Sequence, residues 1–118
     1  MPINRLHVGP RMSQVVIHNK TVYLAGQVAA KAHGKSVAEQ AKEILATIDA
    51  LLKEANTDKS NLLSATIWLT DMGTFGEMNK VWDEWIARSA APARATVESA
   101  RLASPEYKIE IAVIAAQP

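Results

Sequence analysis

The chain has 118 residues with 13 basic and 12 acidic side chains, so its formal net charge is only +1. This balance gives no long-range attraction for a polyanion, and there is no Lys/Arg run, so we expect no nucleic-acid partner. The absence of cysteine excludes disulfides, thiolate metal sites and a cysteine nucleophile. With hydrophobic residues at 48%, the composition and length predict a single domain spanning residues 1–118.

The sequence contains no recognisable targeting segment. The N-terminus lacks the apolar stretch of about 7–15 residues that a signal peptide needs. No segment reaches the roughly 18 apolar residues of a membrane span. We therefore expect a cytoplasmic protein without membrane association.

The first predicted elements are two β-rich runs and a helix. Residues 15–18 and 21–25 are separated only by a short polar pair, which predicts a hairpin. Residues 36–39, Ser-Val-Ala-Glu, have the capping-box pattern, and apolar residues then recur at helical spacing. We predict a long amphipathic helix from Ser36 to near Asn56, with one apolar face that covers a sheet.

The second half of the chain predicts a strand, a helix and two more strands. Residues 63–69 alternate apolar and polar side chains, as a half-buried strand does. Residues 74–77 repeat the capping-box pattern and begin a second amphipathic helix, which stops before Pro92. Residues 94–100 and 107–114 have strand character. The order predicts an α+β fold in which two helices pack on one face of a mostly antiparallel sheet.

Several common kinds of site are not predicted. His7, His18 and His33 have no ligand spacing to one another or to a carboxylate on a shared element, so we expect no metal. Gly26 is the only glycine of its turn and no helix follows it directly, so the turn is not a phosphate loop. No serine lies in a nucleophile-elbow motif.

A charged pair remains on two apolar strands. Arg94 begins one strand, and Glu110 lies inside the run Tyr-Lys-Ile-Glu-Ile of residues 107–111. Either side chain taken alone is more often a solvated surface residue. A guanidinium can hold a carboxylate through two parallel hydrogen bonds, and a carboxylate can orient or deprotonate a water. Together they permit hydrolysis of a small acid at its α-carbon.

Five segments, in the right order along nearly the whole chain, resemble motifs of the Rid (YjgF-type) family. They are Gly9-Pro10 with Ser13-Gln14; residues 25–28; residues 66–71 with Phe75, Met78-Asn79 and Trp82; residues 91–102, which contain Pro92 and Arg94; and residues 107–111. The resemblance implies a chorismate-mutase-like fold whose sheets assemble into a trimeric barrel. It also implies homotrimers with sites in the clefts between subunits.

The resemblance further implies an activity. Family members of the deaminase type hydrolyse enamine and imine intermediates of amino-acid metabolism to 2-oxo acids and ammonia, without a metal or organic cofactor. By the motif match, Arg94 holds the substrate carboxylate and Glu110 positions the attacking water. Gly26 offers backbone groups to the ligand, which a residue without Cβ allows. Thr96, where the family often has cysteine, is a further expected substrate-binding residue.

The chain departs from the deaminase-type motif at its N-terminal positions. Arg11-Met12 follows Gly-Pro, where the family has tyrosine, and Ala25 stands in place of a serine. The loss of these ligand-facing hydroxyls indicates a divergent subgroup. The leading hypothesis is an imine/enamine deaminase, and the alternative is a non-catalytic trimer that binds a small carboxylate metabolite. A third is the ribonuclease or translation-inhibitor activity attributed to some relatives, which the near-neutral charge disfavours.

Overall fold

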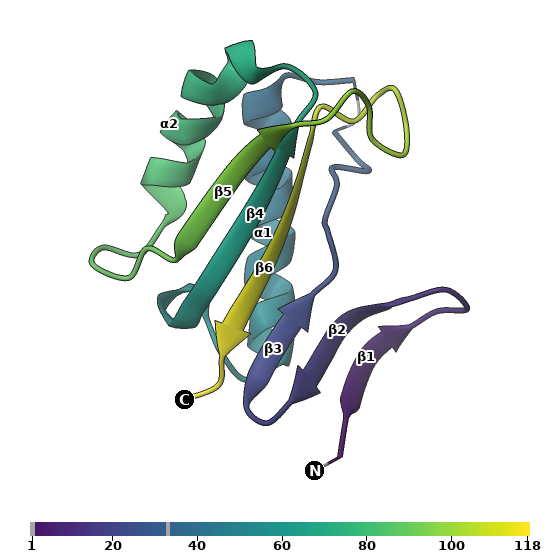
Figure 1. The fold of residues 1–118 in the computed structure, drawn as a ribbon, viewed down its shortest axis with the longest axis vertical. Coiled ribbons are helices and arrows are strands. Elements are labelled where there is room, and N and C mark those ends of the chain that lie inside the picture. The colour runs from purple at the N-terminus through teal and green to yellow at the C-terminus, as the bar shows by residue number, and fades with distance from the viewer. Residues whose placement is uncertain (1, 33) are drawn as a thin grey trace.

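A computed structural model describes residues 2–32 and 34–118. Six strands form one sheet in the order β1-β2-β3-β6-β4-β5 (Figure 1). Neighbouring strands are antiparallel, except for β4 and β5, which are parallel and joined through a helix. The strands are β1 (Asn4–Val8), β2 (Ser13–His18), β3 (Thr21–Leu24), β4 (Leu62–Leu69), β5 (Ala93–Glu98) and β6 (Ile109–Ala116).

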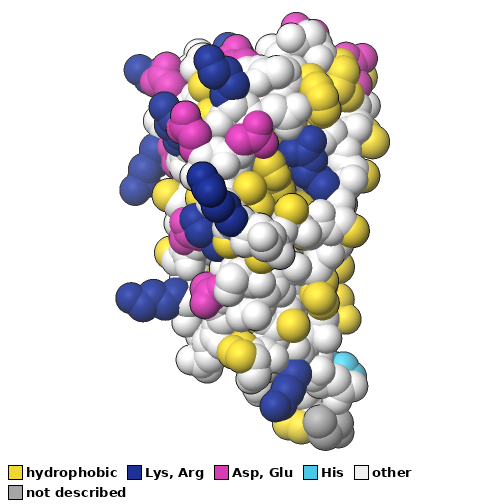
Figure 2. Space-filling model, turned by 90° about the vertical axis from the view of Figure 1, so that its left-hand side faces the viewer, with side chains coloured by type: hydrophobic (Ala, Val, Ile, Leu, Met, Phe, Trp, Pro, Cys, Tyr) yellow, Lys and Arg dark blue, Asp and Glu magenta, His cyan; other side chains and the backbone are white. Residues whose placement is uncertain are grey.

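Two helices, α1 (Val37–Glu54) and α2 (Phe75–Trp85), pack on one face of this sheet and leave the other face uncovered (Figure 1). Figure 2 views the molecule from the α2 and β5 side. Charged side chains gather over the helices, and hydrophobic side chains line the margin where the uncovered sheet face lies. The predicted α+β fold, with two helices on one face of a mostly antiparallel sheet, is confirmed. Among the described residues, no helix is long and apolar enough to cross a membrane.

Helix α1 begins as its sequence predicts. The backbone N–H of Glu39 donates to the hydroxyl oxygen of Ser36 at 3.2 Å, which satisfies one of the free donors of the first turn. The helix ends at Glu54, and Asn56 follows in the left-handed region with φ 60°. The predicted helix and its Ser36 cap are therefore confirmed.

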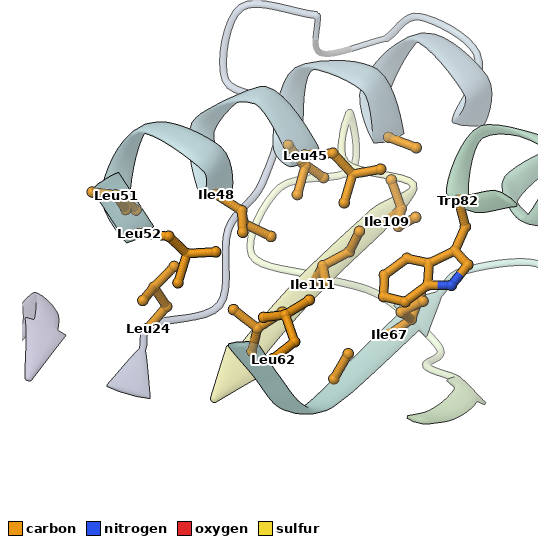
Figure 3. Close-up of a cluster of buried hydrophobic side chains, with 14 of the residues drawn as sticks. Leu24, Leu45, Ile48, Leu51, Leu52, Leu62, Ile67, Trp82, Ile109 and Ile111 are labelled. Atoms are coloured by element: carbon orange, nitrogen blue, oxygen red, sulfur yellow. The ribbon is translucent and has the colours of Figure 1, made fainter. Parts of the chain in front are cut away.

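The hydrophobic core lies between the helices and the sheet (Figure 3). Ile109 and Ile111 of β6 point into it, and Leu52 of α1 packs over the same region. Because side chains alternate along a strand, the intervening Glu110 lies on the uncovered face. The buried Gln40 of α1 is hydrogen-bonded rather than apolar. Its amide donates to two backbone carbonyls, and its oxygen accepts from the N–H of Lys108 at 2.9 Å.

Helix α2 ends at Trp85 and so stops before Pro92, as predicted. Two details differ from the sequence-based prediction. Strand β1 was not predicted, because only Leu6 and Val8 of its five residues are strongly apolar, and four of the five residues are exposed. The predicted Thr74 cap is wrong, since Thr74 accepts no backbone N–H and its hydroxyl instead donates to the Asp71 carbonyl at 2.6 Å. A 3-10 turn, η2 (Met72–Thr74), runs directly into α2, so the capping side chain is Asp71, which accepts from Gly73 N–H at 2.8 Å.

Candidate ligand-binding site

Glu110 lies on the uncovered face of the sheet, near the middle of its most buried strands. It pairs across the ladder with Trp68 of β4, so the carboxylate and the indole are cross-strand neighbours. Burial raises the pKa of the Glu110 carboxyl above its ordinary value, because a partly desolvated carboxylate favours the protonated form. A carboxyl with this kind of shift is better suited to exchange protons near neutral pH than a solvated glutamate.

Gly26 lies directly against the Glu110 carboxylate. A Cβ placed on Gly26 would lie 2.1 Å from Glu110 Oε2, a distance no side chain can occupy. The following residue, Gln27, holds this turn on β6, since its N–H donates to the Ile111 carbonyl at 2.8 Å and its carbonyl accepts from Ile111 N–H at 3.1 Å. The absence of a Cβ at Gly26 therefore allows the Glu110 carboxylate to lie against the backbone, and a Cβ there would force that side chain to move.

Arg94 lies on the other face of the sheet. It pairs with the buried Ala65 in the parallel ladder, and so shares the face that the helices cover. Its guanidinium carbon lies 5.2 Å from the centre of the Trp82 ring and 5.8 Å from that of Phe75. Both aromatic rings come from α2 and stabilise the cation through cation–π contacts. No described side chain makes an ion pair with Arg94, so its hydrogen-bonding edge remains available to an anion.

Two polar atoms without partners lie on the same side as Arg94. Thr96 is the next residue of β5 to point toward α2, and Asn79 lies on the stripe of α2 that carries Phe75 and Trp82. The Thr96 hydroxyl and the Asn79 side-chain oxygen are buried and have no hydrogen-bond partner among the described residues. Buried polar atoms are normally paired, so these two mark the region where β5 packs against α2 as a candidate polar site. Asn79 was not predicted as a site residue. The sequence signal that could have indicated it is a polar residue on the otherwise apolar stripe of this helix.

The four predicted site residues thus form two groups. Glu110 and Gly26 meet on the uncovered face, and Arg94 and Thr96 lie together on the helix-covered face at the edge strand β5. A single ligand cannot touch both groups within one subunit, because the sheet separates them. Chemistry that needs both groups would require two copies of the chain.

The histidines form no metal centre among residues 2–32 and 34–118, where no group of three or more His, Asp or Glu side chains could hold an ion. His7 Nε2 lies 2.8 Å from Glu54 Oε2 and ties β1 to the end of α1. His33 lies outside the described residues.

Comparisons with known proteins agree with this architecture. The sequence profile of the family described as Endoribonuclease L-PSP matches residues 3–117. A RutC family protein of Haemophilus influenzae is 45% identical over 115 residues, covering 98% of both chains. A 2-iminobutanoate/2-iminopropanoate deaminase of Bos taurus is 36% identical over 115 residues, covering 93% of this chain and 82% of the relative. A crystal structure of a YjgF protein family member from Neisseria meningitidis superimposes with a TM-score of 0.95 at 42% identity, over 100% of this chain and 97% of that one.

Proposed function

Because this chain belongs to the Rid (YjgF-type) family, we propose that it hydrolyses reactive imines and enamines of amino-acid metabolism to 2-oxo acids and ammonia. The observation that carries this proposal is the partly buried Glu110 carboxylate held beneath Gly26. The bovine deaminase relative supports the reaction type, since its name specifies two 2-imino acids as substrates.

The chemistry follows from the properties of Glu110. The carboxylate accepts a proton from a water as the water oxygen forms a bond to the imine carbon, while the imine nitrogen takes up a proton from solvent. The resulting carbinolamine carries a hydroxyl and an amino group on one carbon. Protonated Glu110 then returns its proton to the amino nitrogen as the carbon–nitrogen bond breaks. Ammonia leaves, the hydroxyl becomes the carbonyl of the 2-oxo acid as its proton departs to solvent, and the carboxylate is regenerated.

We assign to Arg94 the role of binding the substrate carboxylate. Its guanidinium has a planar fork that matches a carboxylate, it rests on two aromatic rings, and no described carboxylate occupies it. Thr96 and Asn79 supply two polar atoms that such a ligand could satisfy. Because Arg94 and Glu110 lie on opposite faces, we place the reaction between two subunits of a homotrimer. One subunit provides Arg94 and Thr96, and its neighbour provides Glu110 and Gly26.

A non-catalytic trimer that binds a small carboxylate is the second candidate. It is favoured by Ala25 and Arg11-Met12, which supply none of the hydroxyls expected of a deaminase-type site. This function needs Arg94 and its neighbours but gives Glu110 no part in a reaction. Nuclease activity has less support, because the net charge is only +1 and no run of basic residues is present.

Imine decay distinguishes the two candidates. An amino-acid oxidase generates imines in situ, and their disappearance is followed with and without this protein. A deaminase accelerates the decay, and Glu110→Gln abolishes most of the acceleration while 2-oxobutanoate still binds in a calorimetric titration. If the wild-type protein accelerates no imine's decay but binds 2-oxobutanoate through Arg94, the non-catalytic function is correct.

A further inference from the structure

A polar pocket lies at the end of the sheet next to Glu110. The connection between β5 and β6 folds over the end of β4 and forms an open pocket of about 230 Å³. Its lining includes Thr70, Arg101, Ser104 and Tyr107. Neither the motif resemblance nor the proposed reaction gives these residues a role.

The walls of this pocket are fixed by hydrogen bonds. The N–H of Ser99 donates to the Leu69 carbonyl at 2.8 Å, and the N–H of Thr70 donates to the Lys108 carbonyl at 3.1 Å. Lys108 in turn donates its N–H to the fully buried side chain of Gln40 at 2.9 Å. The connection is therefore anchored at both ends to the core, and the cavity is part of the folded structure.

The pocket is close to the candidate reaction centre. Trp68 pairs with Glu110, and Thr70 follows Trp68 by two residues. Residues two apart along a strand point to the same face and are separated by about 7 Å. The pocket thus begins about 7 Å from Glu110 along the uncovered face. The side chain of a substrate held at Glu110 could reach it.

The pocket is built for an anion. Arg101 makes no ion pair with any described residue, and none of the described residues that line the cavity is acidic. Two acidic side chains near this end of the sheet are already engaged, since Glu98 accepts from Met72 N–H at 2.8 Å and Asp71 accepts from Gly73 N–H at 2.8 Å. The remaining polar groups on the wall are hydroxyls, which can donate to an acid group beside the guanidinium.

We propose that this pocket receives a second acid group at the far end of the substrate's side chain, so that the preferred imines derive from acidic amino acids. The proposal rests on the imine hydrolysis proposed above. Arg94 of the neighbouring subunit holds the α-carboxylate, Glu110 acts at the imine carbon, and Arg101 holds the distal carboxylate. Arg101 is exposed at the rim of the pocket, so the preference comes from the charge-assisted hydrogen bonds that an acid group gains there and a neutral amide does not.

Isosteric substrate pairs test the proposal. The value of kcat/KM is measured for imines generated from glutamate and glutamine, and from aspartate and asparagine, which differ in charge but hardly in shape. We expect the wild type to favour the acidic imine of each pair. Arg101→Ala should lower kcat/KM for the acidic imines by about tenfold or more, the worth of a charge-assisted hydrogen bond, and leave the amide imines within about twofold.

Arg5→Ala is the matched control, because it removes the same charged group from β1 at the opposite edge of the sheet. It should leave both members of each pair unchanged. An equal loss for acidic and amide imines in Arg101→Ala, or no wild-type preference for the acidic imines, would overturn the proposal while leaving imine hydrolysis intact.

Failure of the reaction itself has a separate signature. If the wild type hydrolyses no imine, calorimetric titration compares 2-oxoglutarate with 2-oxopentanoate, a dicarboxylate and a monocarboxylate of the same chain length. Tighter binding of the dicarboxylate, lost in Arg101→Ala, supports the pocket as an acid-group site in a non-catalytic protein. Equal affinity for the two compounds rejects it.

Discussion

Arg94 and Glu110 lie on opposite faces of the same six-stranded sheet, with Arg94 beside the aromatic rings of α2 and Glu110 beneath Gly26. The two groups differ in their surroundings. The arginine has aromatic support and no described carboxylate partner, and the glutamate has a raised pKa and a backbone turn against it. The separation explains why one subunit is insufficient for the chemistry proposed here.

Subunit mixing tests this arrangement. Arg94→Ala and Glu110→Gln should each lose nearly all of the wild-type activity as pure proteins. When the two are co-expressed in equal amounts, a site is active only where an intact Arg94 meets an intact Glu110 from its neighbour. In a cyclic trimer that combination arises at about one quarter of the sites, one half multiplied by one half. We therefore expect about a quarter of the wild-type rate of imine decay from the whole co-expressed sample, in which the trimers of a single variant contribute almost nothing.

The control is to mix the same two proteins after each has been purified, under conditions in which trimers do not exchange subunits. This mixture should stay inactive. A co-expressed sample that also stays inactive, although mass spectrometry shows mixed trimers, would place both residues' functions within one subunit and contradict the inter-subunit site.

Replacing Gly26 with alanine should disable the reaction without unfolding the protein. The new Cβ would overlap the Glu110 carboxylate, so that side chain must move. Displacement of a catalytic group by about 1 Å costs on the order of 100-fold in rate, so we expect a loss of that size in kcat. Binding of 2-oxobutanoate through Arg94 should change much less.

Gly76→Ala is the matched control for that substitution. Gly76 lies in the first turn of α2, and a Cβ there would meet nothing within 4 Å. Alanine favours a helix over glycine by roughly 0.5–1 kcal/mol, so Gly76→Ala should keep full activity and gain slightly in free energy of unfolding. Equal activity in Gly26→Ala and Gly76→Ala would mean that the Glu110 position is irrelevant to the reaction.

Much of the fold could be predicted because its signals are local. The alternation in β4 and β6 and the spacing in α1 each report which side of the element is buried. The cap at Ser36 was recognisable because its side chain acts on a residue three positions away. The same pattern at Thr74 gave a wrong prediction, because Asp71 caps the 3-10 turn η2, which precedes α2 and leads directly into it.

The arrangement of the site could not be predicted from local pattern alone. Which face Arg94 occupies depends on the parallel register of β5 against β4, a pairing between residues far apart in the chain. The contact of Gly26 with Glu110 has the same origin, since Gln27 pairs with Ile111. Asn79 and Arg101 have no distinctive pattern in the sequence. Only the structure shows that the Asn79 side-chain oxygen has no hydrogen-bond partner among residues 2–32 and 34–118, and that Arg101 lines a pocket.

The helix caps give a direct stability test. Ser36→Ala removes the oxygen that accepts Glu39 N–H, so we expect the free energy of unfolding to fall by about 1 kcal/mol. Thr74→Ala removes no acceptor from a backbone N–H and should cost less. Urea unfolding of both variants measures the difference, and a larger loss in Thr74→Ala than in Ser36→Ala would contradict the assignment of the caps.

The uncovered face should mediate self-association. Tyr23 and Val97 point to this face and remain 45% and 42% exposed in one subunit, and Trp68 and Ile114 share the face between them. We expect a trimer by light scattering, since an apolar sheet face of this kind is normally covered.

Val97→Lys places a charge on that face and should shift the protein toward monomer. Asp83→Lys places the same side chain at an exposed position of α2 and should leave the trimer intact. A wild type that stays monomeric at micromolar concentration would remove the basis for both the trimer and the inter-subunit site.

The pH dependence of the reaction should report the Glu110 carboxyl. Burial raises its pKa, so the proton is held more tightly than in a solvated glutamate, and the carboxylate that accepts a proton from water is lost as pH falls through the raised value. We therefore expect kcat/KM to be highest above that pKa and to decline on its acidic side. The decline should be centred above the ordinary glutamate pKa of roughly 4.3.

Glu110→Gln cannot ionise, so its residual rate, reduced by about 100-fold or more, should lack this acidic limb. Glu84→Gln removes a carboxylate from the outer surface of α2 and is the control, with a profile like that of the wild type. An acidic limb that persists unchanged in Glu110→Gln would assign the titrating group to another residue or to the substrate, and Glu110 would then not be the base.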